Sequence, residues 1–169
     1  MTSIPMASKQ RRPDWDEYFM RLADLAATRS TCLRRQVGAI LVSGHRVLAT
    51  GYNGAPKGLP HCLDAGCKRE ELKIPSGQRQ EICRAIHAEQ NAIIQAAQHG
   101  VPVKNATVYC TNQPCSTCAK MILNLEVDRI VFRSTYPDDL AVSLLNEAGF
   151  ERAEENGLFV WRKNQPFKL

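Results

Sequence analysis

Two short motifs hold the residues of this chain that are best suited to metal chemistry. One reads HAE and begins at His87, and the other reads PCSTC and ends at Cys118. Neutral imidazole and thiolate are preferred zinc ligands, and a catalytic zinc keeps three protein ligands and one open position. His87, Cys115 and Cys118 supply such a set. Glu89 stands two residues from the histidine, where its carboxylate can exchange a proton with a water that the metal activates.

Each motif alone has another interpretation. A Cys-x-x-Cys pair also occurs in redox proteins and in structural zinc knuckles, and His-x-Glu arises by chance. Here, however, both motifs are expected to open a helix, and the positive end of a helix favours the thiolate that a metal binds. The combination of the two is the signature of zinc enzymes that remove an amino group from nucleobases. The sequence therefore predicts a zinc-dependent deaminase.

The elements expected around these motifs alternate between strands and helices. The apolar spacing and turn residues predict helices over residues 14–27, 84–100, 115–127 and 138–150, and strands over 38–42, 47–52, 106–111, 129–133 and 158–161. Asp14 is the expected cap of the first helix, and Ile86, Ile93, Ile94 and Ala97 form an apolar stripe on the second. This order predicts an α/β fold, a three-layer α/β/α sandwich with a central mixed five-stranded sheet. We expect one domain over residues 1–169, with a flexible arm over 1–13 and an irregular loop over 53–83.

The composition excludes some classes of protein. The chain has 169 residues, of which 44% are hydrophobic, and its 22 lysines and arginines exceed its 17 acidic residues by five. This excess suits an anionic ligand such as a nucleotide, but it is too small to indicate nucleic-acid binding. The first residues lack the apolar core of a signal peptide, and no run approaches the roughly 20 apolar residues of a membrane span. We therefore expect a cytoplasmic protein that binds neither membranes nor nucleic acid.

Four segments resemble the deoxycytidylate (dCMP) deaminases, particularly the bacterial and phage type that includes late competence proteins. They read RSTCLRRQVGAILV, ATGYNGAPKGLPHC, HAEQNAI and PCSTCAKMI, and the likeness runs from about Trp15 to Tyr136. Transfer RNA adenosine deaminases share the two zinc motifs but lack the cysteine-bearing loop. The resemblance implies a cytidine deaminase-like fold and hydrolysis of dCMP to dUMP and ammonia, which feeds dTMP synthesis, with Glu89 as the catalytic proton carrier.

The resemblance also implies contacts with the substrate. Asn53, in GYNG, matches an asparagine that binds the sugar hydroxyl, although Asn-Gly is also a common turn. The phosphate needs cationic partners, for which Arg29 and Arg34 are candidates unless they are plain surface arginines. Tyr136 matches an aromatic position that faces the substrate or packs inside the protein.

Five cysteines remain outside the Cys-x-x-Cys motif. In a cytoplasmic chain, disulfides are rare and metal binding is the leading explanation for many cysteines. Cys110 lies in an expected strand and is predicted to be a core residue. The resemblance implies that the other four bind a second, structural zinc: Cys32, Cys62, Cys67 and Cys83. Such a closed site would hold the loop over residues 53–83, with His61 as an alternative to one cysteine.

Relatives of this type include hexamers that dCTP activates and dTTP inhibits, with Mg as a possible companion of the nucleotide effector. The effector lies near the GYNG loop and the helix that carries HAE. The chain contains GYNGAPKG, but Gln95 and Gln98 stand where some regulated relatives have an aromatic residue and an arginine. A homo-oligomer is therefore expected, and effector control is left open at this point.

Two other functions are compatible with these motifs. One is a zinc deaminase that acts on another cytosine nucleoside or nucleotide, and the other is a non-catalytic zinc protein in DNA uptake. Glu89 argues against the second, because a purely structural zinc site needs no proton carrier.

Overall fold

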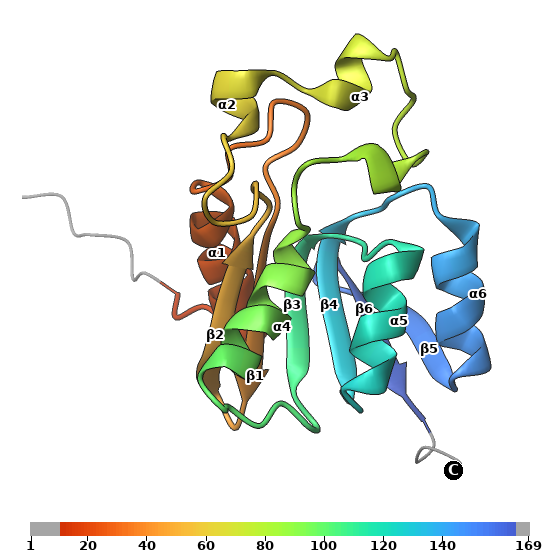
Figure 1. Ribbon diagram of the computed structural model, residues 1–169. Coiled ribbons are helices and arrows are strands. Elements are labelled where there is room, and N and C mark those ends of the chain that lie inside the picture. Colours follow the sequence, from red (N-terminus) through yellow and green to blue (C-terminus); the bar gives the residue numbers. More distant parts are fainter. Residues whose placement is uncertain (1–10, 165–169) are drawn as a thin grey trace, which may run out of the picture.

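A six-stranded mixed sheet organises residues 11–164, the part of the chain that the computed structural model describes (Figure 1). The strands are β1 (Gly38–Ser43), β2 (Arg46–Tyr52), β3 (Thr107–Asn112), β4 (Arg129–Ser134), β5 (Phe150–Glu155) and β6 (Leu158–Lys163). They are ordered β2-β1-β3-β4-β6-β5; β3 and β4 pair in parallel, whereas the other pairs are antiparallel. The predicted α/β class with a mixed sheet is confirmed.

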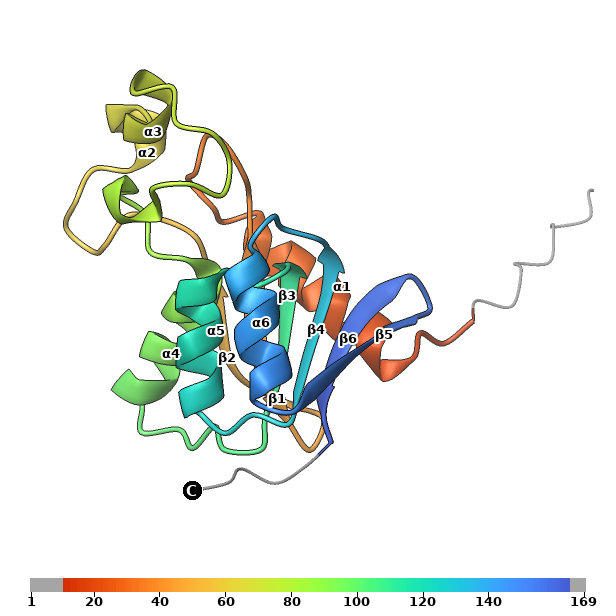
Figure 2. The same cartoon turned by 90° about the vertical axis from the view of Figure 1, so that its right-hand side faces the viewer.

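Helices cover both faces of this sheet. Helix α1 (Trp15–Ala27) packs on one face, and α4 (Ala88–Gln98), α5 (Ser116–Asn124) and α6 (Asp139–Glu147) cover the other (Figure 2). The connection from β2 to α4 contains α2 (Cys62–Ala65), α3 (Lys68–Glu71) and a 3-10 turn (Gln80–Ile82), where the sequence predicted irregular chain. Between residues 11 and 164, none of the helices combines the length and the apolar character that crossing a bilayer requires. Most of the predicted N-terminal arm, residues 1–10, lies outside the described residues.

The sheet has six strands, so the prediction of five was wrong. The missed strand, β5, reads FERAEE, and Phe150 is its one buried residue. Such a charged segment lacks the apolar alternation that marks a strand, because β5 lies at the edge of the sheet and pairs with β6 alone. Asn156 and Gly157 have positive φ angles of 51° and 76° and make the tight turn between the two strands.

Helix α4 begins at Ala88, four residues later than predicted. Ile86 lies before the helix and forms an isolated bridge with Gly54. The Ile86 N–H donates to the Gly54 carbonyl at 2.9 Å, and the Gly54 N–H donates to the Ile86 carbonyl at 3.2 Å. His87 then has extended backbone angles and caps the helix. The bridge places the GYNG segment beside the HAE segment, although more than 30 residues separate them in the chain.

The buried face of α4 is built from small residues and Glu89, so the predicted apolar stripe was wrong in part: Ile93 packs against the large core, but Ile94 and Ala97 are exposed. Ala88, Ala92 and Ala96 are buried, whereas Ile94 is 39% exposed. Gly51 on β2 explains this choice, because a Cβ there would lie 2.1 Å from the Ala88 carbonyl oxygen and 2.5 Å from the Ala92 nitrogen. Helix and strand therefore meet almost backbone to backbone.

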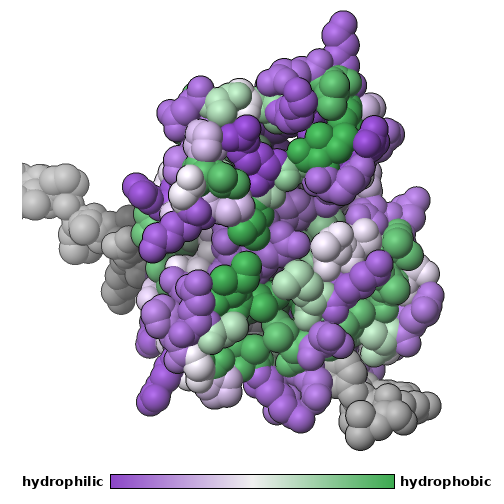
Figure 3. All heavy atoms as spheres, viewed as in Figure 1, coloured by the Kyte–Doolittle hydropathy of each residue, from purple (hydrophilic) through white to green (hydrophobic). Residues whose placement is uncertain are grey.

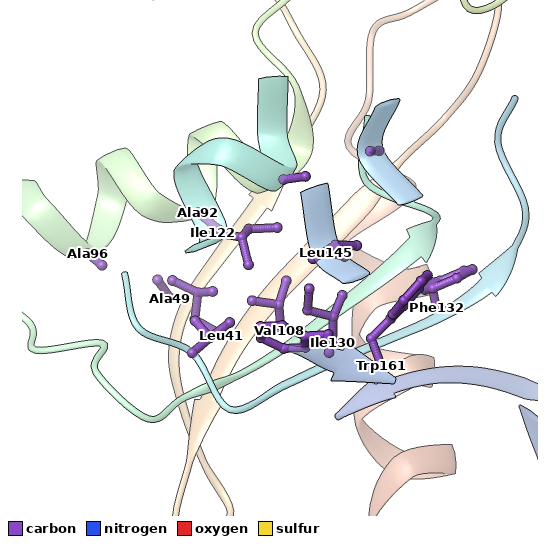
Figure 4. Close-up of a cluster of buried hydrophobic side chains, with 14 residues drawn as sticks. Leu41, Ala49, Ala92, Ala96, Val108, Ile122, Ile130, Phe132, Leu145 and Trp161 are labelled. Atoms are coloured by element: carbon purple, nitrogen blue, oxygen red, sulfur yellow. The ribbon is translucent and has the colours of Figure 1, made fainter. Parts of the chain in front are cut away.

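The larger core lies between the sheet and the layer formed by α4, α5 and α6 (Figure 4). Its labelled members are Leu41, Ala49, Ala92, Ala96, Val108, Ile122, Ile130, Phe132, Leu145 and Trp161. Burial of this apolar surface supplies the main favourable free energy of the fold. The core therefore fixes α4 and α5, the two helices that the zinc motifs open.

Helix α1 is attached to the opposite face by apolar packing and by two ion pairs with β4, Asp16 with Arg129 and the more exposed Asp24 with Arg133. Asp14 caps the helix as predicted, accepting a hydrogen bond from the Glu17 N–H at 2.8 Å. The Asp16 carboxylate accepts hydrogen bonds from Arg129 at 2.5 and 2.6 Å and from the Tyr109 hydroxyl at 2.6 Å. Burial raises the pKa of Asp16, but the contacts with Arg129 and Tyr109 outweigh it and keep the pKa below its ordinary value. The carboxylate therefore stays ionised at neutral pH and holds α1 against β3 and β4.

The contact at Gly51 predicts the effect of one added methyl group. Gly51→Ala should displace α4 and lower the free energy of unfolding by about 1 to 3 kcal/mol, since the clashing atoms are backbone and cannot rotate away. Urea unfolding measures the change. Thr50→Ala, at the exposed neighbouring position, should have little effect and serves as the control. Equal stability of the Gly51 variant and wild type would contradict the close contact.

Candidate active site

The first turns of two helices bring the three predicted zinc ligands together. His87 caps α4, Cys115 caps α5, and Cys118 follows in the first turn of α5. The His87 Nδ1 lies 3.4 Å from the Sγ of Cys115 and 3.4 Å from the Sγ of Cys118. All three ligand atoms lie within 4.8 Å of one another, and no other group of three histidine, cysteine or carboxylate ligands in residues 11–164 does so.

These distances fit a zinc ion. Tetrahedral zinc holds nitrogen at about 2.0 Å and sulfur at about 2.3 Å, which separates the two ligand atoms by about 3.5 Å. A hydrogen bond with Cys118, together with the His87 ring, lowers the pKa of Cys115 to about 4 in spite of its burial. The thiolate that zinc requires is therefore favoured at this position.

Glu89 lies in the first turn of α4 and is 4% exposed. Burial raises the pKa of its carboxyl group above the ordinary value, although the charge of His87 opposes the shift. A carboxyl group whose pKa is raised towards neutrality can both accept and return a proton during a reaction. Glu89 and the ligands His87 and Cys115 line the same pocket.

This pocket is lined by residues from the starts of α4 and α5, from the end of β3 and from the segment that contains α2 and α3, which lies above these helix starts in Figure 1. Three of the four predicted substrate residues line it: Asn53, Arg34 and Tyr136. The structure places Arg29 elsewhere, exposed at the turn that follows α1. Arg34 has a buried Nη1 that makes no hydrogen bond within the described residues.

Asn53 has a structural role that its turn-like sequence did not indicate. Its side-chain oxygen accepts hydrogen bonds from the Ser30 hydroxyl at 2.6 Å and from the Val37 N–H at 2.8 Å. Its amide nitrogen donates to the Arg35 carbonyl at 2.8 Å. Since the amide carries two hydrogens, this contact leaves one of them without a hydrogen-bond partner among the described side chains that line the pocket. Asn53 therefore holds the segment that carries the pocket arginines.

Tyr136 is held at the rim of the pocket by two polar contacts. Its hydroxyl accepts a hydrogen bond from the Gln80 amide at 3.1 Å, and its carbonyl accepts one from the Gln113 amide at 3.2 Å. The Arg35 guanidinium lies over its ring, 5.2 Å from the ring centre. The aromatic ring is thus fixed between the cysteine-rich segment and the end of β3.

Sequence reasoning missed five polar or charged residues of the pocket: Ser76, Arg35, Arg69, Asn112 and Gln113. The last two come directly after the buried part of β3 and before Pro114. Polar residues at the carboxyl end of a strand are a usual sign of a site, and that signal was present in TNQPC. Arg69 lies in the charged run KREE, which is typical of an exposed surface, so its sequence context carried no such signal.

The four remaining predicted ligands also line this pocket. Cys32, Cys62, Cys67 and Cys83 are free thiols, and burial together with the charges of the other three raises the pKa of Cys62. However, no three of their sulfur atoms lie within 4.8 Å of one another. His61 is exposed and contacts the Thr31 hydroxyl at 3.1 Å through Nδ1.

Asp138 connects the starts of α5 and α6. Its Oδ2 accepts a hydrogen bond from the Ser116 N–H at 2.8 Å, and its Oδ1 accepts one from the Ala141 N–H at 3.0 Å. The carboxylate therefore satisfies a free N–H at two helix termini and favours both helix dipoles. Since Ser116 follows Cys115, this contact also fixes the direction of the zinc-binding turn.

The region that contains both motifs is similar to a zinc-binding region of known proteins. The model of the cytidine and deoxycytidylate deaminase zinc-binding region matches residues 13–134, which contain both motifs. The chain belongs to the cytidine and deoxycytidylate deaminase family. It is 42% identical over 153 residues to the deoxycytidylate deaminase of Schizosaccharomyces pombe, covering 88% of this chain and 47% of that protein. It thus spans about half the length of the fungal relatives it matches.

Two further family members resemble the chain over more of their own length. The ComE operon protein 2 of Bacillus subtilis is 38% identical over 157 residues, which cover 91% of this chain and 79% of that protein. The crystal structure of the dCMP deaminase from cyanophage S-TIM5 in complex with dCMP and dUMP has a TM-score of 0.65 at 28% identity. This similarity covers 82% of the chain and 94% of the cyanophage protein. The predicted resemblance to the deoxycytidylate deaminases is confirmed.

The hydrogen bonds that Asp138 accepts from the starts of α5 and α6 predict that it stabilises the turn that carries Cys115. Asp138→Ala should lower the free energy of unfolding by about 2 kcal/mol, because two helix termini lose a hydrogen-bond acceptor. It should also speed the loss of zinc to a chelator. Urea unfolding and a chelator-transfer assay measure the two effects. Asp139→Ala, one residue on and exposed, is the matched control, and the same behaviour in both variants would refute the role of Asp138.

Proposed function

We propose that this protein is a zinc-dependent dCMP deaminase that hydrolyses dCMP to dUMP and ammonia. The observation that carries the proposal is a buried carboxyl group, Glu89, in one pocket with a preformed set of zinc ligands. The fungal relatives at 41% and 42% identity are named deoxycytidylate deaminase, and the cyanophage structure contains dCMP and dUMP. These names support the choice of substrate.

His87, Cys115 and Cys118 would hold the zinc ion, whose positive charge makes water a better nucleophile at neutral pH. Glu89 accepts one proton as the water oxygen bonds to the amino-bearing carbon of the cytosine ring. It delivers this proton to the neighbouring ring nitrogen, then takes the second proton from the hydroxyl group now bonded to the ring carbon and delivers it to the departing amino group. The carbon–nitrogen bond breaks, and ammonia leaves. Burial suits Glu89 to this work, because it raises the carboxyl pKa so that both protonation states are accessible.

The other pocket residues orient the nucleotide. The amide hydrogen of Asn53 that remains free would bind the sugar hydroxyl, while Tyr136 forms an apolar wall for the base or sugar. Arg34 would bind the phosphate, since its buried Nη1 makes no hydrogen bond within residues 11–164. Arg29 is exposed and does not line the pocket, so we omit it from the proposed site.

Removing the proton carrier tests the proposal. Glu89→Gln should bind zinc as wild type does but turn over dCMP about 10²- to 10⁴-fold more slowly, because the amide cannot transfer protons. Zinc content and the rate of dUMP formation are the measurements. Glu81→Gln, an exposed residue upstream of α4, should retain full activity. Activity of the Glu89 variant close to that of wild type would exclude this mechanism.

We also propose that a second zinc binds Cys32, Cys62, Cys67 and Cys83. The segment from Leu59 to Cys83 buries three residues, namely Cys62, Cys67 and Arg69, whereas Leu63 and Leu72 are exposed. Figure 3 shows apolar side chains on the surface of this segment, over α3. It therefore has no apolar core of its own. A metal that draws the four sulfur atoms together would provide the missing constraint.

Metal analysis of the purified protein tests this site. The proposal predicts close to two zinc ions per chain in wild type and close to one in Cys62→Ser. Cys110→Ala should keep both, because Cys110 is buried in β3 and belongs to neither set. Inductively coupled plasma mass spectrometry gives the count. A single zinc in wild type would remove the second site.

The groove beside the GYNG segment and α4, where the resemblance places an effector, offers few cationic partners for dCTP or dTTP, with or without Mg. The groove lies between the 50–61 segment and α4, and among the described residues that line it Lys57 is the single lysine or arginine. Gln95 accepts a hydrogen bond from the Thr50 N–H at 2.7 Å, so it serves the open edge of β2. A triphosphate normally requires several cationic partners. We propose that the activity does not depend on an effector.

This proposal is tested by measuring the rate of dCMP turnover without dCTP–Mg and with increasing concentrations of dCTP–Mg up to a saturating excess. Rates should change less than about twofold, because a single lysine gives a triphosphate little differential affinity for an active state. Lys57→Gln should behave as wild type does. Strong activation by dCTP that Lys57→Gln abolishes would show that the groove is regulatory.

The same groove suggests how copies of the chain associate. Tyr52, Leu59 and Ile94 are exposed apolar residues along it, next to the edge strand β2. We propose that this surface is covered by a second copy in a homo-oligomer, since exposed apolar surface of this kind commonly marks an interface. A cytoplasmic location, where the nucleotide substrate is made and used, is part of the same proposal.

A further inference from the structure

Arg69 is the one buried arginine among residues 11–164, with 9% of its surface exposed. A buried guanidinium is costly unless a carboxylate or another anion compensates its charge. The ion pairs formed within residues 11–164 do not include Arg69. Its charge is therefore buried at the pocket without a carboxylate of the described residues in ion-pair contact. An acidic influence remains from the exposed Glu81, whose pKa is lowered by the hydrogen bond from Arg79 and, to a smaller extent, by the charge of Arg69.

The hydrogen bonds of Arg69 fix its orientation but leave donors free. Nη2 donates to the Pro75 carbonyl at 3.0 Å and to the Gln78 carbonyl at 2.7 Å. These contacts use both hydrogens of Nη2, so the remaining donors are Nε and Nη1. Nε is buried and has no hydrogen-bond partner within the described residues. An unpaired buried donor of this kind calls for a partner from outside the chain, such as a ligand, an ion or a water molecule.

The surroundings of Arg69 favour an anion. Arg34 and Arg35 line the same pocket, and the buried Nη1 of Arg34 also lacks a partner within residues 11–164. Glu89 is the single acidic residue in the described lining, and it belongs to the zinc motif. The lining thus combines a zinc-motif wall, formed by His87, Glu89 and Cys115, with a cationic wall, formed by Arg34, Arg35 and Arg69. This combination matches a small molecule with a reactive ring and a phosphate.

We propose that Arg69 binds the 5′-phosphate of the substrate together with Arg34, and that it selects a nucleoside monophosphate over the free nucleoside. This inference rests on the proposed function, whose substrate it narrows. Arginine presents planar N–H donors that fit phosphate oxygens, and the two carbonyl contacts hold the guanidinium in place before the ligand arrives. The phosphate in turn compensates the buried charge.

A purely structural role for Arg69 makes a different prediction. If its function were only to hold the turn at Pro75 and Gln78, its loss would disturb binding of every ligand equally. A phosphate contact affects only ligands that carry a phosphate. The comparison of a nucleotide with its nucleoside therefore separates the two roles.

The test measures binding of dUMP and of deoxyuridine to zinc-loaded protein by calorimetry. Arg69→Gln should weaken dUMP binding about 10- to 100-fold, as expected for loss of a hydrogen bond to a charged group, and change deoxyuridine binding less than about twofold. Arg79→Gln, an exposed arginine of the same segment that pairs with Glu81, is the control and should leave both unchanged. An equal loss for the two ligands, or no loss for dUMP, overturns the inference.

A second variant covers the case in which Arg69→Gln does not fold, as judged by its thermal unfolding and zinc content. Arg69→Lys keeps the charge and should weaken dUMP binding about 3- to 10-fold with deoxyuridine unaffected. Because these readouts do not require turnover, the two proposals fail separately. Arg69-dependent binding of dUMP without deamination of dCMP would refute only the proposed function. If wild type deaminates dCMP but the Arg69 variants bind dUMP and deoxyuridine with equal losses of affinity, only this inference is refuted.

Discussion

The close approach of α4 to β2 is the contact on which the rest of the site depends. Gly51 offers no side chain, so the backbone of α4 rests against the strand, and its small residues Ala88 and Ala92 face the sheet. This contact fixes the height and direction of the helix start. His87 and Glu89, which flank Ala88, are consequently placed at one end of the sheet. The parallel pair β3 and β4, with α5 between them in the chain, delivers the Cys-x-x-Cys turn to the same end.

The two walls of the pocket are stabilised in different ways. The zinc-motif wall stands on α4 and α5, which pack on the large apolar core, so its geometry is present before a metal binds. Much of the remaining lining belongs to the segment from Leu59 to Cys83, whose buried residues are two thiols and a guanidinium, while Arg34 and Arg35 come from the segment before β1. Thiols and a guanidinium are well accommodated inside a protein when they bind a metal and an anion. The proposed metal and phosphate would therefore stabilise the segment from Leu59 to Cys83, whereas the helices that carry the zinc motifs are held by the large apolar core.

The sequence was sufficient to predict which side chains meet at the candidate zinc site, because His87, Cys115 and Cys118 lie within two short motifs that start helices. A ligand set of this kind needs little long-range information. The isolated bridge of Ile86 with Gly54 was missed, because it depends on a partner more than 30 residues away. Strand β5 was missed because its charged side chains face solvent, although Asn156-Gly157 is a strong hairpin signal. Arg69 was missed because it stands between the exposed residues Lys68 and Glu70 in a charged run, and its burial becomes evident only in the folded segment.

The proposed reaction of this pocket is the hydrolytic removal of the amino group of dCMP. Its most direct test is product analysis after incubation of the zinc-loaded protein with dCMP in water enriched in oxygen-18. We predict dUMP that carries one oxygen-18 atom in the base, with one ammonia released for each dUMP. Failure of the zinc-loaded protein to form dUMP, or dUMP without the label, would contradict the account.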